Sequence, residues 1–231
     1  GIHAIQTPQA FRVALIREAH VKYAGDTSFT DDAGMARAMG HDVTLIPGSR
    51  MNFKITTEDD FLMAADLLSA QKQTRTGMGF DVHAFDPAPA ETLRMGGIDI
   101  PHHHKLKGHS DADVVLHAIT DAVLGTIAAG DIGSHFPPSD PRWKGADSAL
   151  FLQESSRLLH ERGGELVHVD VTVMCEAPKI GPHRDAMRAR IAEILNMNVD
   201  HVAVKATTTE GLGFTGRREG IAAHAVVTVR V

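Results

Sequence analysis

Three side chains that lie far apart in the sequence could bind one metal ion. Asp81 and His83 are two residues apart, so an extended strand would point both of them to the same side. His117 lies in a mostly apolar segment, where an imidazole without a partner would be costly. Zinc accepts nitrogen and oxygen ligands of this kind, and three protein ligands leave a fourth position open for water or substrate. The set predicts a catalytic zinc site, although an Asp-x-His pattern by itself is common by chance.

Two acids share a helix face with His117. Asp113, His117 and Asp121 are spaced four residues apart, which places them on one face of a helix. The segment 110–128 is apolar around most of its circumference, so we expect a largely buried helix. This helix alone fits two interpretations equally well. His117 is either a satisfied core histidine between two acids, or a metal ligand whose outer nitrogen is held by Asp113 or Asp121. The Asp-x-His pair favours the second interpretation.

A glycine-rich stretch near the C-terminus has groups that suit a diphosphate. Residues 205–218 combine threonines, glycines and two arginines, which can all donate hydrogen bonds to an anion. Glu210 would repel phosphate unless a hard cation such as Mg²⁺ lay between them. Taken alone, a glycine-rich turn with surface arginines explains this stretch slightly better. Further upstream, His109 could face an anion at the start of the buried helix, with Ser110 or Asp111 as the helix cap.

These side chains need a scaffold of strands and helices, and the chain divides near residue 72. A short polar join at 71–75 separates an expected domain 1–72, a partial α/β layer, from a domain 73–231 that mixes strands and helices (α+β). Apolar spacing predicts helices at 8–23, 57–69, 110–128, 145–162 and 183–196. Alternation and β-branched residues predict strands at 42–46, 52–55, 167–173 and 225–231. The triple histidine 102–104 follows a proline and favours an exposed loop over a ligand cluster.

Composition excludes several classes of protein. The 231 residues are 43% hydrophobic and 23% charged, which is typical of a soluble globular protein. A net charge of −6 argues against a nucleic-acid partner, and no run of eighteen apolar residues predicts a membrane span. One cysteine excludes a disulfide framework. The first residues lack an initiator Met and the layout of a signal peptide, so we expect a cytoplasmic protein.

Residues 75–231 closely resemble the 2-C-methyl-D-erythritol 2,4-cyclodiphosphate synthases of the non-mevalonate isoprenoid pathway. The matching motifs occur in order and cover the whole second segment: Gly79–His83, His109–Asp113, Leu116–Asp121, Gly130–Gly133, Lys144–Ser148, Ala177–Lys179 and Lys205–Gly216. The resemblance implies that Asp81, His83 and His117 bind zinc. It also implies that His109 and Thr208 stabilise the transition state and that Glu210 binds Mg²⁺ or Mn²⁺.

The same resemblance implies a substrate site and an assembly. The implied substrate contacts are Ser110, Asp131, Ile132, Gly133, Phe136, Asp140, Ala177, Pro178, Lys179, Thr207, Thr209, Phe214 and Arg217. Pro138 departs from the pattern, because many members carry an acid there. The implied fold is a sheet covered by helices on one face, packed as a homotrimer with sites between neighbours. Its central cavity could hold an isoprenoid diphosphate, and Phe214 and Arg217 could face that cavity or the substrate.

The implied reaction converts 4-diphosphocytidyl-2-C-methyl-D-erythritol 2-phosphate to the cyclic diphosphate with release of CMP. Two alternatives stay open on the residues alone. A zinc phosphohydrolase would use metal-bound water to attack a phosphate ester. A trimer that binds isoprenoid diphosphates without catalysis would need no metal chemistry.

Residues 1–70 resemble a different family, the C-terminal part of 2-C-methyl-D-erythritol 4-phosphate cytidylyltransferase. The motifs are Gln6–Phe11, Phe29–Ala33 and Asn52–Thr56, and Lys54 matches a substrate-positioning lysine. The two enzymes are known as bifunctional fusions. The glycine-rich nucleotide loop and basic catalytic residues of the transferase belong to its N-terminal part, so we expect no transferase activity from this chain. Loss of the first strands would also leave sheet faces exposed and the segment only partly folded.

Overall fold

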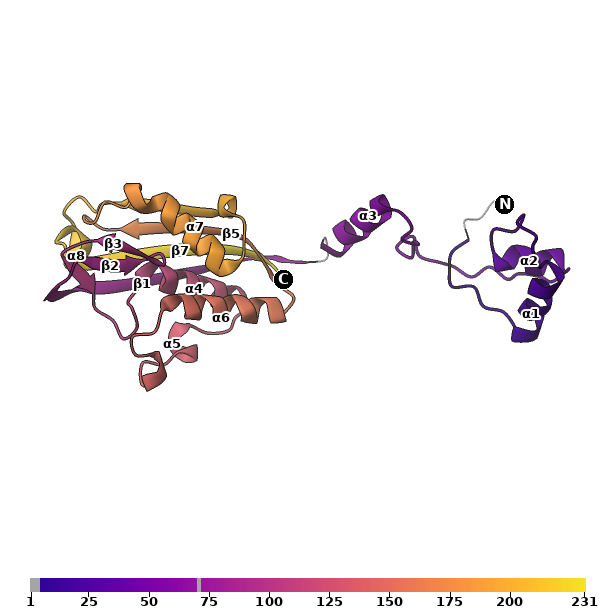
Figure 1. Cartoon of the computed structure of the whole chain (residues 1–231), viewed down its shortest axis with the longest axis horizontal. Coiled ribbons are helices and arrows are strands. Elements are labelled where there is room, and N and C mark those ends of the chain that lie inside the picture. Colours follow the sequence, from indigo (N-terminus) through magenta and orange to yellow (C-terminus); the bar gives the residue numbers. More distant parts are fainter. Residues whose placement is uncertain (1–4, 70–71) are drawn as a thin grey trace. The chain divides into compact units, whose positions relative to one another are not determined.

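The computed structural model describes residues 5–69 and 72–231 (Figure 1). Contacts within the chain divide it into two compact units, residues 1–71 and 72–231. Each unit is described by itself. No helix in the described ranges is long and apolar enough to cross a membrane.

The first unit is helical where it is regular. It contains α1 (Val13–Lys22), α2 (Asp32–Ala38) and α3 (Glu58–Ser69). The last of these confirms the helix expected at 57–69, and Thr57 caps it by accepting a hydrogen bond from the backbone N–H of Asp60 at 3.1 Å. The helix expected at 8–23 begins five residues late, at Val13. The short helix α2 was not predicted, and its cap Asp31 accepts from the backbone N–H of Gly34 at 2.8 Å.

The two strands expected in the first unit are wrong. Residues 42–46 and 52–55 have no regular secondary structure and form no ladder with any described residue. A strand is stable only when its N–H and C=O groups pair with a neighbouring strand. The alternating apolar pattern is still present, but without a partner it leaves Leu45 52% and Ile46 83% exposed.

The second unit is built on a five-stranded sheet in the order β4-β1-β7-β5-β6. The β5–β6 pair is parallel and the other three pairs are antiparallel. A separate hairpin pairs β2 with β3. The bounds are β1 (Thr74–Pro89), β2 (Thr92–Met95), β3 (Ile98–Pro101), β4 (His104–Leu106), β5 (Glu165–Met174), β6 (Val202–Thr207) and β7 (Gly220–Arg230). The strands expected at 167–173 and 225–231 are confirmed as parts of β5 and β7, the latter to within one residue.

Helices cover one face of this sheet (Figure 1). The main ones are α4 (Val114–Thr126), α6 (Ser148–Glu161) and α7 (Arg184–Leu195), with short α5 (Ile132–His135) and α8 (Gly213–Gly216) and 3-10 turns at Pro141–Trp143, Gly181–His183 and Val199–His201. The helices expected at 145–162 and 183–196 are confirmed. The helix expected at 110–128 begins only at Val114. The cap is Asp113, not Ser110 or Asp111, because the Asp113 carboxylate accepts from the backbone N–H groups of Val115 and Leu116.

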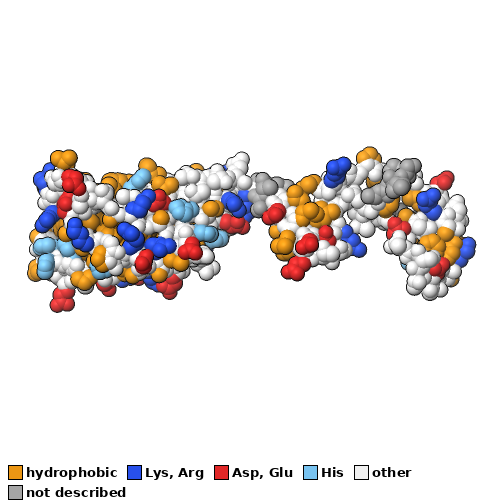
Figure 2. Space-filling model, turned by 90° about the horizontal axis from the view of Figure 1, so that it is seen from above, with side chains coloured by type: hydrophobic (Ala, Val, Ile, Leu, Met, Phe, Trp, Pro, Cys, Tyr) orange, Lys and Arg blue, Asp and Glu red, His pale blue; other side chains and the backbone are white. Residues whose placement is uncertain are grey.

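Successive residues of β1 point to opposite faces of the sheet. Its buried side faces α4, whereas Met78, Phe80 and Val82 point to the opposite, exposed side. The core between sheet and helices is apolar and is built only from residues of the second unit. On the surface seen in Figure 2, acidic and basic side chains are interspersed over this unit, in keeping with the modest net charge of −6.

Candidate metal centre

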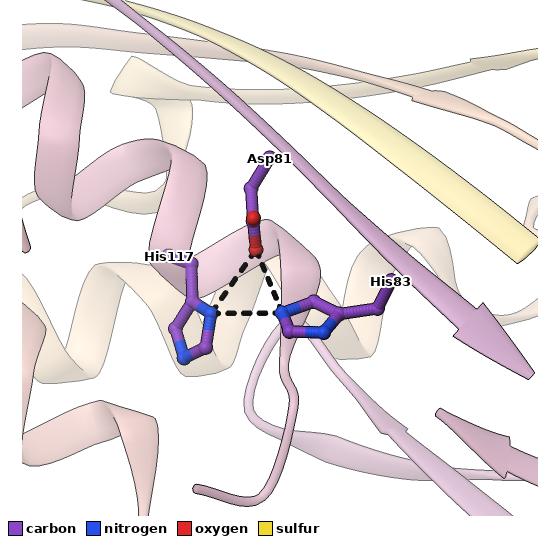
Figure 3. A group of neighbouring side chains, drawn as sticks. All are labelled: Asp81, His83 and His117. Carbon is purple, nitrogen blue, oxygen red and sulfur yellow. Dashed lines mark hydrogen bonds and ion pairs between the residues drawn. The ribbon is translucent and has the colours of Figure 1, made fainter. Parts of the chain in front are cut away.

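Asp81, His83 and His117 converge on one point (Figure 3). The Asp81 Oδ2 atom lies 3.0 Å from His83 Nε2 and 3.0 Å from His117 Nδ1. The two imidazole nitrogens are 3.2 Å apart. A tetrahedral ion bound at about 2.0 Å from each atom would hold its ligands about 3.3 Å apart. The triangle of one oxygen and two nitrogens therefore fits a zinc ion with little movement.

Close packing of β1 against α4 brings these residues together. Asp81 and His83 lie on β1, and His117 lies in the first turn of α4. A Cβ atom on Gly79 would come 1.9 Å from the carbonyl oxygen of Ala118, so only glycine allows the helix to lie this near the strand. Gly79 thus lets α4 lie close enough to β1 for His117 to approach Asp81 and His83.

Burial and neighbouring charges set the protonation of Asp81 and His83. His83 Nδ1 donates to the backbone carbonyl of Lys107 at 2.8 Å, which leaves Nε2 free to bind an ion. Burial is the largest single influence and lowers the pKa of His83, but the hydrogen bond to Asp81, the charges of Asp81 and Asp113 and the bond to Lys107 together raise that pKa. A zinc ion must therefore displace a proton from His83. Burial, the largest single influence, would raise the pKa of Asp81, but the hydrogen bonds and positive charges of His117 and His83 together hold it well below its usual range. Asp81 is therefore an ionised ligand at neutral pH.

The outer nitrogen of His117 contacts two serines. His117 Nε2 lies 2.8 Å from Ser148 Oγ and 3.1 Å from Ser110 Oγ. The expectation that Asp113 or Asp121 holds this nitrogen is wrong, because both carboxylates are engaged elsewhere. Asp113 accepts from four backbone N–H groups, those of Gly96, Gly97, Val115 and Leu116. Asp121 accepts from the backbone N–H of Ile132 at 2.7 Å.

A cavity of about 210 Å³ opens onto the three ligands. Of the other residues expected at the site, it is lined by His109, Ser110, Ile132, Gly133 and Phe136. Pro138, the residue that departs from the family pattern, also lines it, together with Trp143 and Phe151, which the sequence did not single out. A free position beside the ligands is what substrate binding at a metal requires.

Most of the remaining expected site residues form a second group at the far edge of the sheet. Thr207 ends β6, and the Thr208 hydroxyl donates to the Glu210 carboxylate in the loop that follows. The backbone N–H groups of Thr209 and Gly211 donate to the carboxylate of Glu176, which connects this loop to the loop that contains Ala177, Pro178 and Lys179. The last two members of the group are Phe214, on α8, and Arg217, at the C-cap of α8.

The two groups are separated within one chain. Asp81 pairs with Ala223 on β7, Ala223 with Val173 on β5, and Val173 with Ala206 on β6. Three strand spacings separate the ends of this row, about 14 Å. This separation is several times the length of a hydrogen bond, so Thr208 does not contact an ion held by the three ligands of the same chain.

Three further expected residues lie outside both groups, and two of them have local structural roles. Asp131 caps α5 by accepting from Ser134 N at 2.8 Å, and Asp140 forms a salt bridge to Arg142 at 2.6 Å. Lys54 is exposed on an irregular segment of the first unit. None of the three lines the cavity beside the ligands.

Family models match both parts of the chain. Residues 74–230 match the model of the YgbB family. Residues 1–70 match the model of 2-C-methyl-D-erythritol 4-phosphate cytidylyltransferase. Both resemblances drawn from the motifs are thereby confirmed.

Individual relatives agree with these matches. A protein of Rhizorhabdus wittichii named bifunctional enzyme IspD/IspF is 56% identical over 231 residues, which are 100% of this chain and 59% of the relative. A structure titled as the bifunctional IspDF from Campylobacter jejuni is 36% identical with a TM-score of 0.66, over 99% of this chain and 60% of that one. A CDP complex of Plasmodium falciparum IspF is 30% identical with a TM-score of 0.60, over 68% of this chain and 96% of that one. The chain thus spans about three fifths of the length of the bifunctional relatives.

Proposed function

The chain belongs to the YgbB family, and from this premise we propose that residues 72–231 are a 2-C-methyl-D-erythritol 2,4-cyclodiphosphate synthase. In the proposed reaction, an oxygen of the 2-phosphate of 4-diphosphocytidyl-2-C-methyl-D-erythritol 2-phosphate bonds to the β-phosphorus of its diphosphate. The bond from that phosphorus to the CMP oxygen breaks, and CMP leaves. The observation that carries the proposal is the convergence of Asp81, His83 and His117 beside a cavity.

The proposed roles of the protein groups follow from the charges. The nucleophile is already a phosphate anion, so the residues need not remove a proton from it. Zn²⁺ at the three ligands and Mg²⁺ or Mn²⁺ at Glu210 would supply the positive charge that lets two phosphate groups approach. His109, at the cavity, and Thr208 would donate hydrogen bonds to the phosphate oxygens. Holding the reacting groups in line contributes up to about 7–11 kcal/mol, more than any single hydrogen bond.

Completing the site requires a second chain in this proposal. Because three strand spacings, about 14 Å, separate Asp81 from Ala206 in one chain, a neighbouring chain would bring its own Thr208 and Glu210 to the cavity. The helix-free sheet face supports such an assembly, since Met78 is 65%, Phe80 53% and Val82 44% exposed. Apolar side chains gathered on one face are typical of an interface. We propose a homotrimer, whose central cavity could hold an isoprenoid diphosphate.

The substrate proposal draws on the solved relatives. The Plasmodium falciparum structure is titled as a CDP complex, and CDP contains the cytidine and diphosphate of the proposed substrate. Loops 131–140 and 175–181 would hold the methylerythritol and cytidine parts.

For the first unit, we propose no transferase activity from the residues present. Its match to the cytidylyltransferase covers only residues 1–70. A hollow of about 670 Å³ lined by residues 5–11 and 43–48 lies where the expected strands find no partner.

Phosphorus NMR of the reaction tests the synthase proposal. Incubation with the cytidylated substrate and Mg²⁺ should yield CMP and a cyclic diphosphate. His83→Ala and His117→Ala should abolish CMP release and lower bound zinc, whereas His103→Ala, an exposed histidine outside the site, should leave both unchanged. Release of inorganic phosphate or of free methylerythritol bisphosphate would instead indicate a phosphohydrolase. Undiminished turnover in either ligand variant would contradict the proposal.

A further inference from the structure

Ser148 is a fully buried hydroxyl that the proposed reaction does not use. We propose that Ser148 and Asp111 are positioning residues that hold His117 with its Nδ1 atom toward the metal. This inference rests on the metal site proposed above. It assigns the outer support of His117 to a serine and a carboxylate from two different segments of the chain.

A hydrogen-bond chain runs from the ligand to Asp111. Ser148 Oγ lies 2.8 Å from His117 Nε2 and also contacts Asp111 Oδ1. The backbone N–H of Ser148 donates to Asp111 Oδ2 at 3.0 Å. Asp111 thus binds Ser148 through both carboxylate oxygens. The guanidinium of Arg94 lies 4.0 Å from Asp111 Oδ2 and complements its charge.

The hydrogen bonds from His117 through Ser148 to Asp111 can run in one direction only. An ionised carboxylate only accepts hydrogen bonds, so the Ser148 hydroxyl must donate its proton to Asp111. A hydroxyl has one proton, and Ser148 Oγ can then only accept from His117. His117 Nε2 must therefore carry a proton. In the neutral imidazole, the form that binds a metal, the lone pair is then on Nδ1, the atom 3.0 Å from Asp81 Oδ2.

Ser110 is a weaker candidate for this role. Its Oγ is 3.1 Å from His117 Nε2 and accepts from the backbone N–H of Ala112 at 3.3 Å. No carboxylate takes the Ser110 proton in the hydrogen bonds of the described residues, so this hydroxyl can serve either tautomer. Of the two serines that contact His117 in the described residues, Ser148 is the one whose proton is donated to a carboxylate.

Helix capping does not explain the Ser148 hydroxyl. The N-cap of α6 is Asp147, whose carboxylate accepts from the backbone N–H of Ala149 at 2.8 Å. Ser155 provides a matched control on the same helix. It is also fully buried, but its hydroxyl donates to the backbone carbonyl of Leu152 at 2.8 Å and has no contact with the metal ligands.

Zinc affinity of the full chain, measured by competition with a chromogenic chelator, tests the role of Ser148. Ser148→Ala should weaken zinc binding about tenfold or more, the effect typical of losing a partner of a ligating histidine. Asp111→Asn should also weaken zinc binding. It keeps the shape of the side chain but places an amide N–H opposite either the hydroxyl or the backbone N–H of Ser148, which both donate to Asp111. Ser155→Ala should bind zinc within about twofold of the wild type. Equal affinity of Ser148→Ala and wild type, or an equal loss in Ser155→Ala, would overturn the inference.

The absorption spectrum of the Co²⁺-loaded chain is a second readout that general destabilisation would not imitate. A ligand field altered in Ser148→Ala but unchanged in Ser155→Ala is the expected result, and unchanged spectra in both would overturn the inference. If the wild type binds no zinc, the proposed metal site itself fails. If the wild type binds zinc and Ser148→Ala binds it equally well, only the role of Ser148 fails.

Discussion

Gly79→Ala should disrupt the packing that assembles the metal ligands. The added Cβ would lie 1.9 Å from Ala118 O and 2.8 Å from Ala122 N, both backbone atoms of α4 that cannot rotate away. Ordinary contact begins at 3.4 Å, so strand and helix must separate by about 1.5 Å. Overpacking of this kind costs about 1–3 kcal/mol, and backbone obstruction places Gly79→Ala in the upper half of that range.

Two measurements check this magnitude. In a protein of this size, about 2–3 kcal/mol lowers Tm by about 4–12 °C. Functional sites tolerate only about 0.5 Å of displacement, so zinc affinity should fall at least about tenfold. Gly125→Ala is the control, because its Cβ would meet only Gly77 Cα, at 3.9 Å. A Gly79→Ala chain with wild-type Tm and zinc affinity would refute the reasoning.

Three further outcomes follow from the contacts. Asp113→Ala leaves four buried backbone donors without their acceptor and should cost about 3 kcal/mol or more; a change in urea-unfolding free energy below about 1 kcal/mol would contradict this. Burial raises the pKa of the Cys175 thiol to about 11, so alkylation by iodoacetamide, followed by mass spectrometry, should accelerate about tenfold per pH unit between pH 8 and 10, and a plateau below pH 9 would be the contrary result. A chain that begins at Lys72 should have a Tm within about 2 °C of the temperature at which residues 72–231 unfold in the full chain, because the buried core contains no residue of the first unit. A larger drop in Tm would show that the first unit stabilises the second.

Periodic signals in the sequence were sufficient for the long elements. Alternating valines predicted β5 and β7, and the apolar stripe predicted α7, because each of these elements buries one face against its own unit. The same alternation at 42–46 failed, since a strand also needs a partner whose presence no local pattern reports. The predicted start of α4 was wrong because Ser110, Asp111 and Asp113 are all residue types that cap helices well, and the tertiary structure decides which of them is used.

The metal ligands could be predicted because their residue types are chemically specific and the Asp-x-His spacing defines a common side. Their supporting partner could not be. Asp113 and Asp121 share a helix face with His117 by spacing, but the cap position and the contact with Ile132 turn both away. Ser148 lies 31 residues from His117, and the one local signal was a serine just after a helix-capping aspartate. The separation of Thr208 from the ligands depends on strand order, which the sequence does not encode locally.

Anomalous X-ray scattering at the zinc absorption edge, from crystals of the zinc-loaded chain, tests the metal site most directly. We expect one peak at about 2.0–2.2 Å from Asp81 Oδ2, His83 Nε2 and His117 Nδ1, with a fourth ligand that is not a protein atom. A peak elsewhere, a closed shell of four protein ligands, or coordination through His117 Nε2 would contradict the account.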